Sequence, residues 1–235
     1  MKLFKWLLPF ILIGVGLWYL VFKTDFLTVK TILYNQNEEL DIYELQRYSG
    51  IHYGDSYFSV NLDQAKSGLL QHPFVKEVAV NKNFPDQVIF NLTYKQHCFN
   101  LKYSDIILSL DSDLDVLKVL ESENDGYTVE GFKFNGFSTG KKIDVEQEYV
   151  LENIVDLIDL MNQSGLEYQK TILYNQSNIR IRIGAVNVKF GNGENIEKRF
   201  NAFVTIYESL SKEGVASGVI DVSSDGLPVY RPFGE

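Results

Sequence analysis

The chain contains very little cysteine and very little histidine. Its 235 residues include one cysteine, Cys98, and three histidines, His52, His72 and His97. A single cysteine cannot close an intrachain disulfide, so we expect Cys98 to behave as a small buried apolar side chain. The three histidines are far apart in the sequence, and none has a partner at helical spacing. We therefore predict neither a disulfide framework nor a zinc site.

Basic residues are scarce as well. Lysine and arginine together number 22, against 31 aspartates and glutamates, which gives a formal net charge of −9. Binding to a phosphate backbone requires clustered lysine and arginine, so the composition argues against a nucleic acid as the partner. Hydrophobic residues make up 45% of the chain. That fraction is ample for a packed core and argues against a disordered chain.

Motifs for catalysis or cofactor binding are missing. Aspartates alternate over 111–115 as at the start of a calcium loop, but the sixth and twelfth places of that loop hold Val116 and Ser122 instead of glycine and glutamate. The run 191–195 lacks the Lys-Ser/Thr of a P-loop, and no Gly-x-Ser-x-Gly elbow occurs. We expect a polar turn at the first run and a helix cap at the second. No catalytic, cofactor-binding or metal-binding residue is predicted.

A long apolar run is present at the N-terminus. Residues 6–22 contain no charged side chain and span about 26 Å as a helix, which suffices to cross a bilayer. Lys2 and Lys5 precede the run, and the small residues of a signal-peptide cleavage site do not follow it. We therefore predict a cytoplasmic segment over 1–5, one transmembrane helix over 6–22, and the remaining chain outside the cytoplasm.

The region 26–95 reads as strand, helix, helix, strand, strand. A strand pattern over 30–34 precedes a helix that begins after Asp41, with Glu44 completing a capping box, and ends at Gly50. A second helix over 62–70 stops before Pro73, because proline has no amide hydrogen.

Two strand patterns then flank the turn 83–86, which predicts an antiparallel hairpin. We expect Phe74 and Val75, at the start of this hairpin, to be core positions.

The region 96–233 is rich in strand patterns and has two amphipathic helices, over 150–161 and 196–210. A hairpin is predicted across Gly184, and a last extended piece, 227–233, follows the turn at 225–226. The segment 121–150 matches no clear pattern. The expected fold class is therefore α+β, with a mixed β-rich domain after the first unit.

One heptapeptide, Lys-Thr-Ile-Leu-Tyr-Asn-Gln, occurs twice, at 30–36 and at 170–176. Each copy predicts a strand followed by a turn. A separation of 140 residues is not the period of a repeat protein.

Several linked strings resemble one known family. In the order and spacing of the POTRA domain of the bacterial cell-division family FtsQ/DivIB, this chain has Ser49-Gly50-Ile51, Gly54 with Phe58-Ser59-Val60, His72-Pro73-Phe74-Val75 and Phe84-Pro85. The strings 188–191 and 220–222, with Lys198 between them, are similar to the closing pattern of the same family. The resemblance implies a POTRA domain over 26–95 and an FtsQ/DivIB-type β domain over 96–233.

This resemblance also implies a function. It indicates a non-enzymatic scaffold, anchored in the cell membrane with its N-terminus inside, at the division septum. The implied partners are membrane proteins of the FtsB/DivIC and FtsL kind, and indirectly septal peptidoglycan synthases. Two alternatives remain open, namely an anchored cell-wall enzyme and a POTRA protein of polypeptide transport.

The resemblance further places the partner site on the last strand. Pro228 and Pro232 cannot donate to a β-ladder, which confines the segment 227–233 to the edge of a sheet. An edge can accept a strand from another chain. The predicted partner-binding residues are Leu227, Val229, Tyr230, Arg231 and Phe233. Tyr230 would be an aromatic anchor and Arg231 a rim or acid-pairing contact. The alternative is a frayed terminus.

Overall fold

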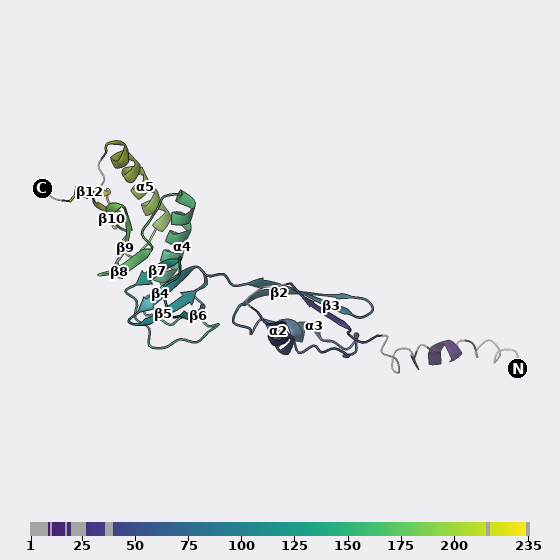
Figure 1. Ribbon diagram of the computed structural model, residues 1–235. Helices are drawn as coiled ribbons and strands as arrows, with labels where there is room; N and C mark the ends of the chain where they lie inside the picture. The colour runs from purple at the N-terminus through teal and green to yellow at the C-terminus, as the bar shows by residue number, and fades with distance from the viewer. Residues whose placement is uncertain are drawn as a thin grey trace. The chain divides into compact units, whose positions relative to one another are not determined.

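The computed structural model describes Pro9 and residues 11–16, 18–19, 27–35, 40–214 and 217–233. These residues divide between Lys95 and Gln96 into two compact units (Figure 1). The predicted cytoplasmic segment 1–5 lies outside the described residues, and so does the predicted transmembrane helix 6–22 taken as a whole. Among the residues that are described, no helix has both the length and the apolar character needed to span a bilayer.

The first unit is a three-stranded sheet with two helices. Its elements are β1 (Thr31–Tyr34), α2 (Ile42–Ser49), α3 (Leu62–Leu69), β2 (Val75–Asn83) and β3 (Gln87–Tyr94). The strand order is β1-β3-β2, with β1 parallel to β3 and β2 antiparallel to it. The predicted order strand, helix, helix, strand, strand is confirmed, and so is the hairpin.

Local signals set the ends of α2. The Asp41 carboxylate accepts a hydrogen bond from the Tyr43 amide at 2.9 Å, and the C-cap Gly50 has φ 65°. The predicted capping box is wrong in one part. The Glu44 carboxylate lies 3.6 Å from the Arg47 guanidinium and 3.8 Å from the His72 ring, so it contacts these side chains instead of the start of its own helix.

The core of the first unit lies between the sheet and the helices. It is made of Val29, Ile32, Leu45, Ile51, Ala65, Leu69, Val75, Val78, Val88, Phe90 and Leu92. Val75 is buried, as predicted, but Phe74 is only half-buried. The reason is positional, because Phe74 precedes the first residue of β2. Within β2 an irregularity in the register between Val75 and Glu77 lets both Val75 and Val78 face the core, although they are three residues apart.

The second unit is built on one nine-stranded sheet. Its elements are β4 (Phe99–Tyr103), β5 (Ile106–Leu110), β6 (Val116–Leu120), β7 (Tyr127–Glu130), α4 (Glu148–Ser164), β8 (Thr171–Asn175), β9 (Asn178–Ile183), β10 (Ala185–Lys189), α5 (Ile196–Lys212), β11 (Ser217–Asp221) and β12 (Val229–Pro232). The strand order is β12-β11-β10-β9-β8-β7-β4-β5-β6. The predicted mixed β domain with two amphipathic helices is confirmed.

The segment 121–150, which sequence patterns left open, contributes β7 to the middle of this sheet. β7 pairs in parallel with β4 on one side and with β8 on the other. The chain after β7 reaches α4 through a loop held by two isolated bridges, Asp115 to Lys142 and Phe134 to Val145. A strand of four residues placed by parallel partners distant in sequence has no local signature, which is why it was missed.

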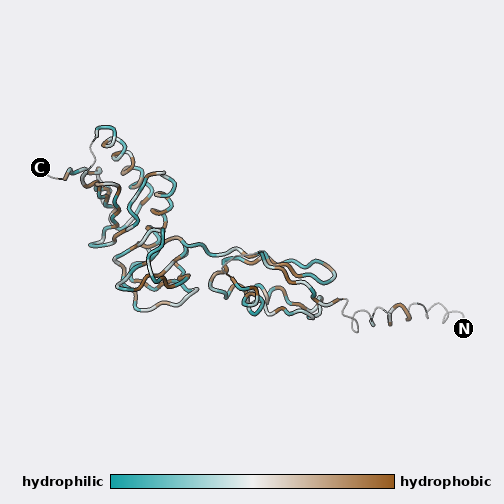
Figure 2. The backbone as a smooth tube through the Cα atoms, in the orientation of Figure 1, coloured by the Kyte–Doolittle hydropathy of each residue, from teal (hydrophilic) through white to brown (hydrophobic). Residues whose placement is uncertain are grey.

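Helices α4 and α5 contribute their apolar faces to the core of the second unit. Leu151, Ile154 and Phe203 are buried, and they belong to the same cluster as Ile181, Val188 and Ile220 of the sheet. Figure 2 shows apolar and polar stretches alternating along both helices. In β9, β10 and β11 the buried residues also alternate with exposed or half-exposed ones, so this part of the sheet has one packed face and one open face.

The repeated heptapeptide forms a strand in both units. Ile32 and Ile172 are buried, while Leu33 and Leu173 are exposed. The tyrosine of each copy packs on a phenylalanine, with ring centroids 4.9 Å apart for Tyr34 on Phe90 and 4.8 Å apart for Tyr174 on Phe132. The prediction of two strands is therefore confirmed.

A candidate partner-binding edge at the end of the large sheet

The last strand, β12, lies at the edge of the nine-stranded sheet. It pairs antiparallel with β11, with Asp221 opposite Val229 and Gly218 opposite Pro232. Within the described part of the chain, β12 has a neighbour on one side only. The strand is shorter than the predicted piece 227–233, because β11 ends at Asp221 and leaves Leu227 with no residue opposite.

The register determines which backbone groups of β12 face outward. The Val222 amide donates to the Lys189 carbonyl of β10 at 2.9 Å. Because successive residues of a strand point their backbone groups to alternate sides, Asp221 and Val219 must face β12. Their opposite residues, Val229 and Arg231, therefore exchange hydrogen bonds with β11.

The backbone groups of Tyr230 and Pro232 consequently face away from the sheet. Pro232 has no amide hydrogen, and the same is true of Pro228, which lies one residue before the strand. The free edge of β12 thus offers a single N–H donor, that of Tyr230, between proline positions that can only accept.

The side chain of Tyr230 is held within its own unit. Its hydroxyl donates to the Ser217 carbonyl at 2.7 Å, and its ring is half-buried against the core. A Cβ atom at Gly218 would lie 2.5 Å from the Arg231 carbonyl oxygen and 2.6 Å from the Tyr230 ring, so the close seating of β12 requires glycine there. The Tyr230 hydroxyl is therefore hydrogen-bonded within its own unit, and it is the backbone N–H and carbonyl of Tyr230 that face outward.

The other predicted residues lie at the surface. Leu227 is 90% exposed, and Val229, Arg231 and Phe233 are exposed as well. Val229 and Arg231 share the open face of the sheet, whereas Leu227 and Phe233 flank the strand. The structure thus places the five predicted residues along one edge, three of them within β12.

One carboxylate lies beside this edge. Burial by itself raises the pKa of Asp221, but hydrogen bonds from the hydroxyl and amide of Ser223, together with the charges of Lys189 and Arg231, outweigh it and leave the pKa below its usual value. Asp221 is therefore ionised at neutral pH and acts as an internal counter-charge for Lys189, whose ammonium lies 4.0 Å away.

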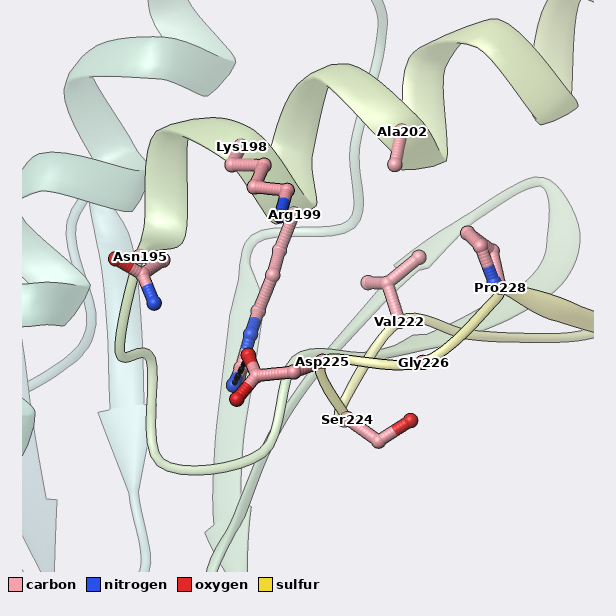
Figure 3. Close-up of a pocket in the computed structure, with 9 residues that line it drawn as sticks. All are labelled: Asn195, Lys198, Arg199, Ala202, Val222, Ser224, Asp225, Gly226 and Pro228. Carbon is pink, nitrogen blue, oxygen red and sulfur yellow. Dashed lines mark ion pairs between the residues drawn. The ribbon is translucent and has the colours of Figure 1, made fainter.

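The loop between β11 and β12 is tied to the start of α5. Arg199 is buried, and its guanidinium donates to the Phe190 carbonyl at 2.6 Å. It also lies 3.5 Å from the Asp225 carboxylate, as Figure 3 shows. Arg199 and Asp225 line a cavity of about 90 Å³, together with Lys198 and Pro228. The chain thus enters β12 from a loop that makes an ion pair with a buried cation.

Sequence reasoning missed this anchor. Arg199 lies on the apolar stripe of α5, between Ile196 and Phe203 at helical spacing, and a cation in such a stripe is the signal that could have revealed it. Its partner Asp225 could not be found, because the pairing joins a helix to a turn 26 residues later.

The other sequence features have structural roles. The Asp111 carboxylate accepts hydrogen bonds from the Asp113 and Asp115 amides, which makes a turn, as predicted. Cys98 is half-buried, and burial raises the pKa of its thiol to about 11, so the thiolate is not formed at neutral pH. Within the described residues, no group of three or more His, Cys, Asp or Glu side chains is placed to hold a metal ion.

Comparison with known proteins supports the family resemblance. The model of the family "POTRA domain, FtsQ-type" matches residues 27–93. Cell division protein DivIB of Clostridium tetani is 22% identical over 216 residues, which cover 89% of this chain and 81% of that protein. Cell division protein DivIB of Clostridium botulinum strain Hall is 24% identical over 215 residues, covering 90% and 84% respectively. The chain therefore contains an FtsQ-type POTRA domain and is a distant homologue of the DivIB cell division proteins over about 90% of its length.

Proposed function

We propose that this chain is a non-enzymatic scaffold of bacterial cell division, which binds partner proteins outside the membrane through the edge strand β12. The proposed partners are membrane proteins of the FtsB/DivIC and FtsL kind, and through them the septal peptidoglycan synthases. The proposed location is the cell membrane at the division septum, with residues 6–22 as a single transmembrane helix and residues 1–5 in the cytoplasm.

The free edge of β12 is the observation that carries the proposal. An added strand gains affinity from backbone hydrogen bonds and specificity from the alternating side chains. At this edge the Tyr230 N–H and carbonyl can form one pair of bonds, and the carbonyl of Pro232 can accept a further one. Val229 and Arg231 would contact the partner on the open face of the sheet, with Leu227 and Phe233 at the ends of the strand.

The seating of the strand supports the same conclusion. An edge can serve as a template only if it is held in place before the partner arrives, because ordering a loose segment on binding costs free energy. Here the Tyr230 hydroxyl bond and the packing of its ring on the core hold the strand, and the ion pair of Arg199 with Asp225 contacts the loop that precedes it. This arrangement differs from a frayed terminus.

Truncation after Gly226 provides the first test. The full chain and the truncated chain are tagged, cross-linked in intact cells and purified from membranes, and their companions are identified by mass spectrometry. The truncated chain should remain folded, because β11, α4 and α5 keep their contacts, yet it should lose its membrane companions. Capture of the same companions by both chains would show that β12 is not the binding site.

A matched pair of substitutions separates backbone from side chain. Both substitutions remove the Tyr230 ring and its hydroxyl bond to Ser217 of β11. Tyr230→Pro also removes the outward N–H without removing a backbone bond to β11, whereas Tyr230→Ala keeps that N–H. Capture should fall further for proline than for alanine, by about fivefold if one backbone bond worth about 1 kcal/mol is lost. Equal capture by the two variants would contradict pairing through the backbone.

A further inference from the structure

Two exposed phenylalanine rings lie together at one end of the first unit. Phe58 is 63% exposed and Phe84 is 66% exposed. Both pack edge-on against the buried ring of Tyr57, with ring centroids 5.6 Å and 6.0 Å away respectively. Phe58 lies in the loop before α3, and Phe84 lies in the turn between β2 and β3. We call Phe58 and Phe84 the aromatic pair.

The loop that carries Phe58 is held against β2. The Lys82 ammonium of β2 donates hydrogen bonds to the Tyr57 carbonyl at 2.8 Å and to the Val60 carbonyl at 3.0 Å. The same ammonium lies 5.3 Å from the centre of the Tyr57 ring, within the range of a cation–π contact. Because the loop is already ordered, covering the aromatic pair costs little conformational entropy. Exposed apolar groups on such a surface mark it as a contact site.

The aromatic pair lies where the chain enters the first unit from the N-terminus. The Tyr57 amide donates to the Leu27 carbonyl at 2.9 Å. The Lys30 amide donates to the Asp86 carbonyl, also at 2.9 Å. These bonds place the entry segment 27–30 beside both the loop and the turn that carry the aromatic pair. Figure 1 shows the turn of the hairpin and the entry of the chain at the same end of the unit.

From this position we infer that the aromatic pair contacts the surface of the lipid bilayer, so that the first unit rests on the membrane through these two rings. The inference rests on the proposed function, because it takes residues 6–22 as the transmembrane helix. Residue 22 and Leu27 are then five residues apart, and even a fully extended chain of that length spans only about 18 Å. A linker this short keeps the end of the unit that bears the aromatic pair close to the lipid headgroups.

The chemistry of the aromatic pair suits a bilayer surface. Phenylalanine is one of the residues with which membrane-surface segments enter the boundary between headgroups and acyl chains. The headgroup layer is about 5–8 Å thick on each side of the bilayer, which is comparable with the size of one ring. The Lys30 ammonium lies 3.9 Å from the Asp86 carboxylate, so the charge beside the aromatic pair is largely balanced. We therefore expect the contact to depend on burial of the rings and not on attraction to anionic lipids.

Photo-crosslinking of the full chain in growing cells tests the inference. The photoreactive residue p-benzoylphenylalanine, which bonds to nearby C–H groups, replaces Phe84 in one strain and Phe58 in a second. It replaces Tyr43 in a control strain, because Tyr43 is also an exposed aromatic residue of the first unit. Its neighbour Glu44 contacts His72 just before β2 begins, and β2 extends for about 26 Å from there to the hairpin turn. Mass spectrometry of the purified chain shows whether each adduct is a phospholipid or a polypeptide.

The expected result is a phospholipid adduct from positions 84 and 58 and none from position 43, in chain that resists extraction from the membrane with alkaline carbonate. Phe58→Ser should lower the lipid yield at position 84 by about fivefold, because one of the two apolar contacts is lost. Tyr43→Ser is the matched control and should leave that yield unchanged. If hydrogen exchange shows that Phe58→Ser unfolds the unit, Phe84→Ser with the photoreactive residue at position 58 replaces it.

Each other outcome overturns the inference. Integrated chain that forms a lipid adduct at neither or only one of positions 84 and 58, or an equal one at position 43, would show that the aromatic pair does not rest on the membrane, while the proposed function stands. Adducts on a polypeptide in place of lipid would assign the pair to a protein partner. A lipid yield at position 84 that Phe58→Ser leaves unchanged would show that the pair does not act together. Release of the chain by carbonate would overturn the proposed membrane anchor and this inference together.

Discussion

His72 is a buried titratable side chain of the first unit. Its Nδ1 accepts a hydrogen bond from the Phe74 amide at 3.2 Å, and its ring lies edge-on to Tyr48. Burial lowers its pKa from the ordinary value of 6.5, and Glu44 opposes this effect only in part. The neutral imidazole is therefore the form that the folded unit contains.

This burial predicts a pH dependence of stability. Above pH 6.5 His72 is neutral in both the folded and the unfolded chain, so it contributes no dependence. As the pH falls through 6.5, the unfolded chain takes up a proton that the folded chain does not, and the free energy of unfolding falls. Urea denaturation of residues 26–235, followed in the first unit by hydrogen exchange, should show a lower midpoint at pH 5 than at pH 7.

His72→Asn is the matched control, because its side-chain oxygen can take the place of Nδ1 and does not titrate. The drop in midpoint between pH 7 and pH 5 should shrink in this variant. An identical drop in both proteins would mean that other groups cause the acid sensitivity.

At the scale of the elements, the positions of its prolines determine which hydrogen-bond donors β12 exposes at its free edge. Pro232 occupies an outward-facing position, so the strand can remain exposed without offering the regular row of donors that makes edges associate with one another. The edge can therefore pair with a strand that needs only one N–H donor from β12. It is poorly suited to pair with the β12 strand of a second copy of this chain.

Pro232→Thr should therefore promote self-association. The threonine adds a second outward N–H two residues from that of Tyr230, and two symmetric bonds of about 1 kcal/mol each would tighten edge-to-edge pairing by about tenfold or more. Analytical ultracentrifugation of residues 26–235 measures the change. Arg231→Thr is the control, because it places a threonine in the same strand at a position whose N–H faces β11. The sedimentation of this variant should match that of the unaltered chain. Equal sedimentation of Pro232→Thr and the unaltered chain would contradict the assigned direction of the N–H groups.

Elements whose signals are local could be predicted from the sequence. Asp41 and Gly50 predict the ends of α2, and the alternation of apolar and polar residues over 179–190 predicts the hairpin of β9 and β10. The edge position of β12 followed from Pro228 and Pro232, although its bounds did not. The parallel placement of β7 and the anchor formed by Arg199 depend on partners far along the chain, and no short window of sequence contains that information.

At the scale of the whole molecule, the two units have separate cores. Leu69 is fully buried in the core of the first unit, and Leu157 is fully buried in that of the second. Because neither core cluster includes residues of the other, the loss of packing in one should leave the contacts of the other intact.

We therefore expect two separable unfolding transitions. Leu69→Ala should lower the free energy of unfolding of the first unit by about 2–5 kcal/mol, from lost transfer energy and a cavity, and Leu157→Ala should do the same to the second. Hydrogen exchange with mass spectrometry reports on peptides from each unit separately under increasing urea. If either substitution shifted both units equally, the chain would unfold as one cooperative body.

The repeated heptapeptide has a consequence for the accuracy of folding. In an unfolded chain, residues 170–176 can present to β3 the same side chains as residues 30–36, so local sequence cannot decide which copy pairs there. Loop closure hardly helps, because the spans from Thr31 to Gln87 and from Gln87 to Thr171 differ by less than a factor of two, and each doubling costs only about 0.6 kcal/mol.

The neighbours of each copy must therefore decide the outcome. The tyrosine of each copy stacks on a phenylalanine, so this contact does not distinguish the two copies. The Tyr34 hydroxyl lies 3.0 Å from the Ser49 hydroxyl in the first unit, whereas β8 pairs with both β7 and β9 in the second. Correct assembly of the two sheets thus relies on residues outside the repeat, which must disfavour the pairing of residues 170–176 with β3 in place of residues 30–36.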